Sequence, residues 1–299
     1  MKRVIDKAFW LFILARPKEW IKNSFALAPL VFSMHLTDLS ACKRAVLAIV
    51  ALCAASSFGY VLNDYLDRKS DAQHPIKKGR PIPAGRIRTW EAVAFGLALF
   101  VLAEFVAFGV DPLLGWVVNA YFVLTSLYSA YLKRKVIVDV LTIGCCFVLR
   151  VLAGGVAIGV VVSQWLVLCT FLLAIFLGFS KRRHELTQLG DSAREHRWVL
   201  TLYSKEFLDQ MNLVTITLTL TCYIFYTISP ETVARFGTTN LLYSVLIVMF
   251  GLFRYLFLVH KKGKGSPTEV LYTDRQIVVI VLLWTLYMIL AIYTVPAIA

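Results

Sequence analysis

Residues 43–71 read KRAVLAIVALCAASSFGYVLNDYLDRKSD, and this stretch decides the fold. Its first part, residues 43–62, is predominantly apolar and has about the length that an α-helix needs to cross a bilayer, roughly 20 residues. It then opens into a polar segment that carries three aspartates, Asp64, Asp67 and Asp71, and a basic loop follows. The stretch therefore predicts a transmembrane helix that ends in a group of carboxylates at a membrane surface.

Apolar segments of this kind recur along the whole chain. Of its 299 residues, 59% are hydrophobic and only 16% are charged, and the mean hydropathy is +0.72. This composition is typical of an all-α polytopic membrane protein and excludes an ordinary soluble domain. We expect a bundle of about nine transmembrane helices, at residues 20–36, 43–62, 90–110, 112–132, 136–158, 163–180, 211–228, 239–259 and 276–296. No linker separates a second domain, so we expect one domain over 1–299, with long charged loops at 63–89 and 181–210.

Positive charge is concentrated on one side of these predicted helices. The formal net charge is +13, and 26 of the 31 Lys and Arg residues lie in the N-terminal segment or in the loops at 63–89, 133–135, 181–210 and 260–275. Cytoplasmic loops of membrane proteins carry an excess of Lys and Arg. We therefore predict a cytoplasmic N-terminus, a C-terminus outside, and a protein integral to the cytoplasmic (inner) membrane. No nucleic-acid partner is expected, and the chain could form a homo-oligomer.

Three charged residues fall deep in the predicted spans, namely Glu104, Arg150 and Arg254. Charges are costly inside a bilayer and usually find partners within the bundle, so we expect these three to pair with one another. The six cysteines form no CxxC pair and no cluster with histidine. We interpret them as small apolar residues of the spans.

The segment around Asp64 offers oxygen ligands only. Asn63, Asp64, Asp67 and Asp71 place three carboxylates at i, i+3 and i+7, close to one helical face. Hard oxygen ligands suit Mg²⁺, which usually takes one or two protein carboxylates together with substrate phosphates. Carboxylates at the mouth of a membrane bundle are functional by default because they are costly to bury. We predict a Mg²⁺ site at these four residues, with Asp64 and Asp67 required for catalysis.

Basic side chains that could hold phosphates accompany this acidic group. The loop over residues 72–86 is rich in Pro and Gly, and Lys and Arg bind phosphate oxygens well. For the N-terminal cations and for the end of the fourth span, anchoring at the membrane interface is the alternative. The predicted substrate-binding residues are Arg16, Lys18 and Lys22 around the start of the first span, Lys77 and Arg80 in the loop, Tyr131 and Lys133 at the end of the fourth span, and Lys181, Arg182, His184 and Glu185 after the sixth.

Two further expectations concern partners of these cations. Three consecutive helical positions cannot all face one pocket, so among residues 181–183 we expect Arg183 to matter least. Asp139 lies four residues after Lys135, a spacing that predicts an ion pair between the two.

Taken together, these motifs resemble a known family. Asn63-Asp64-Tyr65-Leu66-Asp67, the segment Arg80-Pro81-Ile82-Pro83-Ala84-Gly85 and the number of spans are similar to the UbiA-type intramembrane prenyltransferase superfamily, over essentially the whole chain. The resemblance implies that an NDxxD motif binds a diphosphate through Mg²⁺. Most members carry a second Asp-rich motif after the sixth span. Here that position reads Ser180-Lys181-Arg182-Arg183-His184-Glu185-Leu186, and the nearest aspartate is Asp191.

This departure, together with the segment at residues 16–23, resembles the decaprenyl-phosphate 5-phosphoribosyltransferase branch. The resemblance implies a Mg²⁺-dependent glycosyltransferase that moves the 5-phosphoribosyl group from phosphoribosyl diphosphate to a polyprenyl (decaprenyl) phosphate, releasing diphosphate, for cell-wall arabinan precursors. A basic motif suits a site that must hold extra phosphates.

Two other classes remain open. One is a UbiA-type prenyltransferase that moves a polyprenyl group to an aromatic acceptor, against which the basic motif argues. The other is a transporter whose Asp64 and Asp67 bind a coupling ion. Transporters usually place their polar groups at mid-membrane, so the charge on one face argues against this reading.

Overall fold

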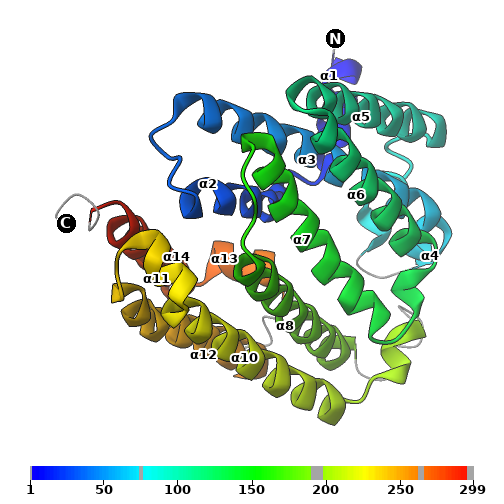
Figure 1. Ribbon diagram of the computed structural model, residues 1–299. Coiled ribbons are helices and arrows are strands. Elements are labelled where there is room, and N and C mark those ends of the chain that lie inside the picture. The colour runs from blue at the N-terminus through cyan, green and yellow to red at the C-terminus, as the bar shows by residue number, and fades with distance from the viewer. Residues whose placement is uncertain (1, 74–76, 190–197, 262–265, 295–299) are drawn as a thin grey trace.

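The long helices lie side by side and form two groups (Figure 1). The computed structural model describes residues 2–73, 77–189, 198–261 and 266–294, and every regular element in these ranges is a helix. Eight helices are long and apolar enough to cross a membrane, which confirms the all-α membrane class. They are α3 (Leu39–Leu66), α5 (Thr89–Val110), α6 (Pro112–Ala130), α7 (Val138–Ile158), α8 (Gln164–Leu189), α10 (Lys205–Ile228), α12 (Ser244–Lys261, directly after η6, Asn240–Tyr243) and α14 (Arg275–Tyr293).

The shorter elements connect these helices or lie at their ends. They are α1 (Lys2–Ala15), η1 (Pro17–Leu27), α2 (Ala28–Phe32), α4 (Arg68–Gln73), η2 (Lys77–Gly79), η3 (Leu132–Arg134), η5 (Trp198–Leu202), α11 (Pro230–Phe236) and α13 (Pro267–Thr273). Two predicted loops are therefore partly helical. The loop at 63–89 begins inside α3, and the loop at 181–210 begins in the last turns of α8.

The first predicted span, residues 20–36, differs most from expectation, and the count of nine transmembrane helices is not confirmed. It consists of the 3₁₀ helix η1 and the short helix α2. Pro29 lies in the first turn of α2, and because proline has no backbone N–H it cannot continue a hydrogen-bonded ladder from η1. At about 2.0 Å per residue in η1 and 1.5 Å in α2, the two together cover about 30 Å. This is about the thickness of a bilayer core.

Small residues let the helices of the first group, α3, α5, α6 and α7, approach closely. Alanines of α3, among them Ala48, Ala51 and Ala55, are fully buried against α5, α6 and α7, as is usual where membrane helices pack backbone to backbone. Gly154 of α7 is the tightest of these contacts, because a Cβ there would lie 1.9 Å from the backbone oxygen of Ala26 in η1. The second group, α8, α10, α12 and α14, packs around larger side chains, among them Phe176, Leu252 and Tyr255.

Candidate active site

A cavity of about 1800 Å³ extends from the end of α3 between the two groups of helices. Between α8, α12 and α14 its walls are apolar and include Phe176, Leu252, Trp284 and Met288. The end near α3 is strongly charged. There the lining side chains are Arg16, Lys22, Asn63, Asp67, Asp71, Lys77, Arg80, Lys133, Lys181 and Glu185. Residues from six separate segments of the chain thus meet at one mouth.

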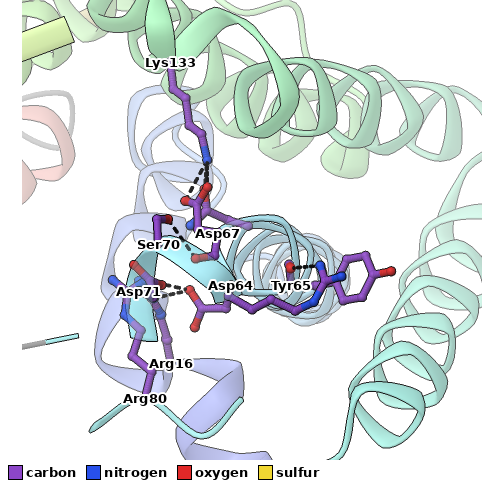
Figure 2. Close-up of polar contacts among 10 residues, drawn as sticks. Arg16, Asp64, Tyr65, Asp67, Ser70, Asp71, Arg80 and Lys133 are labelled. Atoms are coloured by element: carbon purple, nitrogen blue, oxygen red, sulfur yellow. Dashed lines mark hydrogen bonds and ion pairs between the residues drawn. The ribbon is translucent and has the colours of Figure 1, made fainter. Parts of the chain in front are cut away.

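The carboxylates of the acidic segment are held by cations from elsewhere in the chain (Figure 2). Asp64, in the last turn of α3, is only 1% exposed. Its Oδ1 accepts hydrogen bonds from Nη2 of Arg16 at 2.6 Å and from Nη1 of Arg80 at 3.0 Å. The same Nη1 of Arg80 donates to Oδ2 of Asp71, on α4, at 2.5 Å. Asp64 is not among the residues that line the cavity, but both of its partners are.

Asp67 points away from this pair. Nζ of Lys133 lies 2.7 Å from both of its carboxylate oxygens and 3.0 Å from Oδ1 of Asn63, and Figure 2 shows Lys133 reaching it from the opposite side. The reason is that α3 ends at Leu66 and Asp67 is its C-cap, with a non-helical φ of −88° and ψ of 1°. The three carboxylates therefore do not share one continuous helical face, contrary to the prediction from spacing.

The electrostatics of this mouth follow from burial and from the ion pairs. Burial raises the pKa of Asp71 above its ordinary value, and the neighbouring Arg80 and Lys77 oppose that shift only in part. For Arg16, burial lowers the pKa, but Asp64, together with Tyr60 and Glu19, more than compensates and the net shift of the pKa is upward. Arg16 is therefore a permanently charged group at the mouth.

The donor set fits Mg²⁺ in its chemistry. Asn63, Asp64, Asp67 and Asp71 supply oxygen atoms only, which are the ligands that Mg²⁺ prefers. Within the described part of the chain, no three Asp, Glu, His or Cys side chains converge into a ready cage. A site that uses one or two carboxylates and completes its shell with phosphates and water needs no such cage. Arg16, Arg80 and Lys133 now contact these oxygens, and the same cations could turn to phosphate when a metal binds.

The basic motif at residues 181–183 divides its three cations among three surroundings. Lys181 lines the cavity, and its side chain is 42% exposed. Arg182 is 1% exposed and does not line it. Its guanidinium instead binds Asp139 at 2.7 Å and Glu185 at 2.6 Å. Arg183 binds Asp209 at 2.6 Å, as expected for a side chain that is turned by about 100° from each neighbour on the helix.

Two expectations from sequence are corrected here. Asp139 pairs with Arg182 of α8, where the sequence predicted Lys135, and Oδ1 of Asp139 also accepts a hydrogen bond from the Tyr203 hydroxyl at 2.9 Å. Asp139 pairs with Arg182 of α8 and not with Lys135 of its own segment because Asp139 is fully buried and faces α8. Arg182 was predicted to bind substrate, but its side chain does not line the cavity. It binds Glu185, which does line the cavity.

The remaining predicted residues are distributed unevenly. Tyr131 lines the cavity mouth. Lys18 and His184 are not among its lining residues within the described chain. At Lys18 it is the backbone carbonyl that makes a contact, with the hydroxyl of Tyr272 at 3.4 Å.

The charges deep in the bundle do not pair with one another as predicted. Glu104 accepts a hydrogen bond from Asn119 at 2.9 Å, and Arg254 binds Asp274 at 2.8 Å. Arg150 lines the cavity and donates to neutral groups of η1, α6 and α7. Sequence reasoning did not assign it to the site, although an arginine in the middle of an apolar span was the available signal.

Comparison with known proteins agrees with this geometry. A model of the UbiA prenyltransferase family matches residues 25–280. The chain is 28% identical to the decaprenyl-phosphate phosphoribosyltransferase of Mycolicibacterium smegmatis, over 90% of this chain and 88% of the relative. It is also 28% identical to that of Corynebacterium glutamicum, over 94% and 86%. A solved UbiA homologue from Archaeoglobus fulgidus, bound to DMAPP and Mg²⁺, has the same fold, with a TM-score of 0.71 over 94% of this chain and 98% of that chain at 18% identity.

Proposed function

This chain belongs to the UbiA prenyltransferase family, and from that membership we propose that it transfers the 5-phosphoribosyl group of phosphoribosyl diphosphate to a polyprenyl phosphate. The observation that carries the proposal is the make-up of the cavity mouth. Three carboxylates there, Asp67, Asp71 and Glu185, accompany six cations, namely Arg16, Lys22, Lys77, Arg80, Lys133 and Lys181. A prenyl diphosphate brings one diphosphate, whereas this reaction brings a diphosphate, a sugar phosphate and a lipid phosphate together. The excess of cations suits the second case.

The similarity to two decaprenyl-phosphate phosphoribosyltransferases over most of the chain supports the same choice. We further propose that the chain is a single UbiA-type domain over 1–299, that the cavity mouth faces the cytoplasm, and that the product feeds cell-wall arabinan synthesis. The concentration of Lys and Arg on that side supports the orientation.

Asn63, Asp64, Asp67 and Asp71 would hold Mg²⁺, as their oxygen-only donor set fits. When bound, Mg²⁺ supplies neutralisation of charge on the leaving diphosphate. The cations that now contact these carboxylates, Arg80 and Lys133 among them, would then hold phosphate oxygens. Arginine can do this with two parallel hydrogen bonds, and lysine acts as a point charge.

In the reaction, the bond between ribose C1 and the diphosphate oxygen breaks, with oxocarbenium-like character at C1. An oxygen of the lipid phosphate forms the new bond on the opposite face, so the configuration at C1 inverts and diphosphate leaves. A phosphate monoester is already anionic near neutral pH, since its second pKa is about 6. No side chain needs to remove a proton from the nucleophile, and the chain contributes mainly by positioning and by electrostatic stabilisation.

The apolar part of the cavity suits the polyprenyl tail. Phe176, Leu252, Trp284 and Met288 line it between α8, α12 and α14, and these apolar walls can replace the equally apolar lipid tails around the chain. The phosphate of the lipid would then lie at the charged mouth, where Lys181 and Lys133 line the same cavity.

The test is product analysis with both kinds of donor present. Purified protein is incubated with Mg²⁺, phosphoribosyl diphosphate, a prenyl diphosphate, polyprenyl phosphate and 4-hydroxybenzoate, and products are identified by mass spectrometry. We expect phosphoribosylated lipid and no prenylated aromatic compound, and we expect Asp64→Ala to abolish the product. A prenylated aromatic product without phosphoribosylated lipid would refute the proposal in favour of aromatic prenyl transfer.

A further inference from the structure

Arg150 is a buried cation in the middle of the bundle. It lies within α7 and is 4% exposed. Its Nε donates to Oδ1 of Asn23 at 2.8 Å, its Nη1 to the carbonyl of Cys146 at 3.0 Å, and its Nη2 to the hydroxyl of Tyr121 at 2.7 Å. All three acceptors are uncharged, and no carboxylate in the described part of the chain forms an ion pair with Arg150.

An uncompensated charge in this position is expensive. Arginine stays protonated under all ordinary conditions, and a buried charge without a counter-charge is strongly destabilising. The other buried arginine of the described chain, Arg182, is neutralised by Asp139, and the partly exposed Arg254 pairs with Asp274. Arg150 is therefore a functional candidate, since intramembrane charges usually mark a ligand pathway.

The surroundings of Arg150 identify the kind of ligand. Its side chain lines the same cavity as the carboxylate cluster, and so does Lys22 of η1. The two cations lie within electrostatic reach of each other. Lys22 has Glu19 as a partner, so the three groups together keep a net positive charge. Tyr60 and Tyr121 also line the cavity, and the Tyr121 hydroxyl is held next to the guanidinium of Arg150.

The depth of Arg150 separates the inner end of this cluster from the proposed metal site. Asn23, which binds Arg150, also donates to Oγ of Ser56 on α3 at 3.2 Å. Ser56 precedes Asp64 by slightly more than two helical turns, or about 12 Å along α3. A guanidinium with five N–H donors and three assigned partners retains, among the described contacts, a further N–H on each terminal nitrogen. A ligand group at this depth would be a second anion, distinct from a diphosphate at the mouth.

We propose that Arg150 and Lys22 form a second anion subsite, which binds a phosphate monoester inside the bundle. On the proposed function, on which this assignment of substrate rests, two groups have that chemistry: the 5-phosphate of the phosphoribosyl donor and the phosphate of the polyprenyl acceptor. A donor held by its diphosphate at one end and by its 5-phosphate at the other has its C1–O bond fixed in orientation, which lowers the barrier by positioning.

The first test measures binding without turnover. Ribose 5-phosphate is titrated into the purified full-length protein in detergent by isothermal calorimetry, with EDTA present so that no divalent metal contributes, and ribose serves as the blank. We expect Arg150→Gln to weaken the Kd by about 10- to 100-fold, the loss of one charge-assisted contact, and Arg150→Lys to restore part of it. The matched control is Arg254→Gln, which removes an arginine that does not line the cavity and should leave the Kd unchanged.

A purely structural role for Arg150 gives a different result. Its bonds to η1 and α6 could simply hold these elements together. In that case Arg150→Gln lowers the melting temperature but leaves the Kd for ribose 5-phosphate as in the wild type, and the proposal is overturned. Should Arg150→Gln fail to purify in folded form, Lys22→Gln carries the same test.

The second test identifies which substrate supplies the phosphate. Steady-state rates of Arg150→Gln are measured while each substrate is varied in turn. A raised KM for phosphoribosyl diphosphate alone assigns the 5-phosphate, and a raised KM for polyprenyl phosphate alone assigns the lipid. Unchanged KM values for both overturn the subsite. The two proposals can also fail separately. If the wild-type protein forms no phosphoribosylated lipid, but Arg150→Gln still weakens the binding of ribose 5-phosphate, the proposed function fails while the subsite stands.

Discussion

At Asp64, one oxygen of a buried carboxylate accepts hydrogen bonds from two guanidinium groups, those of Arg16 and Arg80. The sequence predicted the importance of Asp64 and Asp67 from their type and spacing alone. It could not predict that they face different cations, because this depends on where α3 ends. Nor could it predict that Arg182 pairs with Asp139, since the contact joins two helices that are distant in sequence.

For the acidic pair, we expect Asp64→Ala and Asp67→Ala each to abolish turnover while the protein still inserts and purifies. Each change removes an oxygen ligand of the proposed Mg²⁺ site. EDTA in excess should likewise stop the wild-type reaction, and added Mg²⁺ should restore it. Rates are measured by formation of lipid product. The control is Asp111→Ala, at the N-terminus of α6, which should keep its rate; a near-normal rate for either test variant would show that the metal assignment is wrong.

For the basic motif, adjacent residues should respond in opposite ways. Lys181→Ala should lower kcat/KM by about one to two decades through the loss of one phosphate contact, with little change in melting temperature. Arg182→Ala should destabilise the protein by about 3–5 kcal/mol, because the buried carboxylate of Asp139 loses its guanidinium partner. Kinetics and thermal unfolding of both variants check this. Equal melting temperatures for the two would contradict the role assigned to Arg182.

At the scale of elements, the eight long helices were predictable because each is a long apolar run bounded by charges. The segment from Pro17 to Phe32 was not, since hydropathy cannot distinguish a single α-helix from a 3₁₀ helix followed by a short α-helix. What fixes η1 is tertiary contact. It packs against α7 at Gly154 and reaches α3 through Asn23 and Ser56.

Gly154→Ala should therefore loosen η1 from α7. The added methyl group would lie 1.9 Å from the backbone oxygen of Ala26, and a backbone atom cannot move aside as a flexible side chain can. We expect a loss of at least about 1–3 kcal/mol, the usual effect of overpacking, seen as a lower melting temperature. Gly109→Ala is the matched control, because a Cβ there has open space and alanine favours a helix more than glycine does. Equal stability of the two variants would refute this packing.

At the scale of the whole molecule, the Lys and Arg count predicted that charge gathers on one side, and the structure brings some of those charges, Arg16, Arg80 and Lys133 among them, to one cavity mouth. The depth of the cavity and the place of Arg150 in its wall were not. A charged residue in an apolar run shows that a partner is needed, but the sequence does not say whether that partner is a side chain or a ligand.

The orientation in the membrane can be tested with reporter fusions. A reporter that is active only in the cytoplasm should be active when fused after Arg86 and inactive when fused after Ala299, because the Lys and Arg bias places the basic loops inside. A reporter that is active only outside should give the reverse pattern and serves as the control. If both reporters invert, the charge-bias argument fails for this chain.

The cations already paired with Asp64, Asp67 and Asp71 have a thermodynamic consequence for the order of events. A metal ion alone would compete with Arg16, Arg80 and Lys133 for these oxygens and weaken the ion pairs of those cations. A diphosphate alone would draw the same cations away and leave the carboxylates uncompensated. Both groups arriving together satisfy both sets, so each should raise the affinity of the other by the same factor. The mouth would then bind the metal–diphosphate complex tightly and either component alone only weakly. This is heterotropic cooperativity that arises from the exchange of ion pairs.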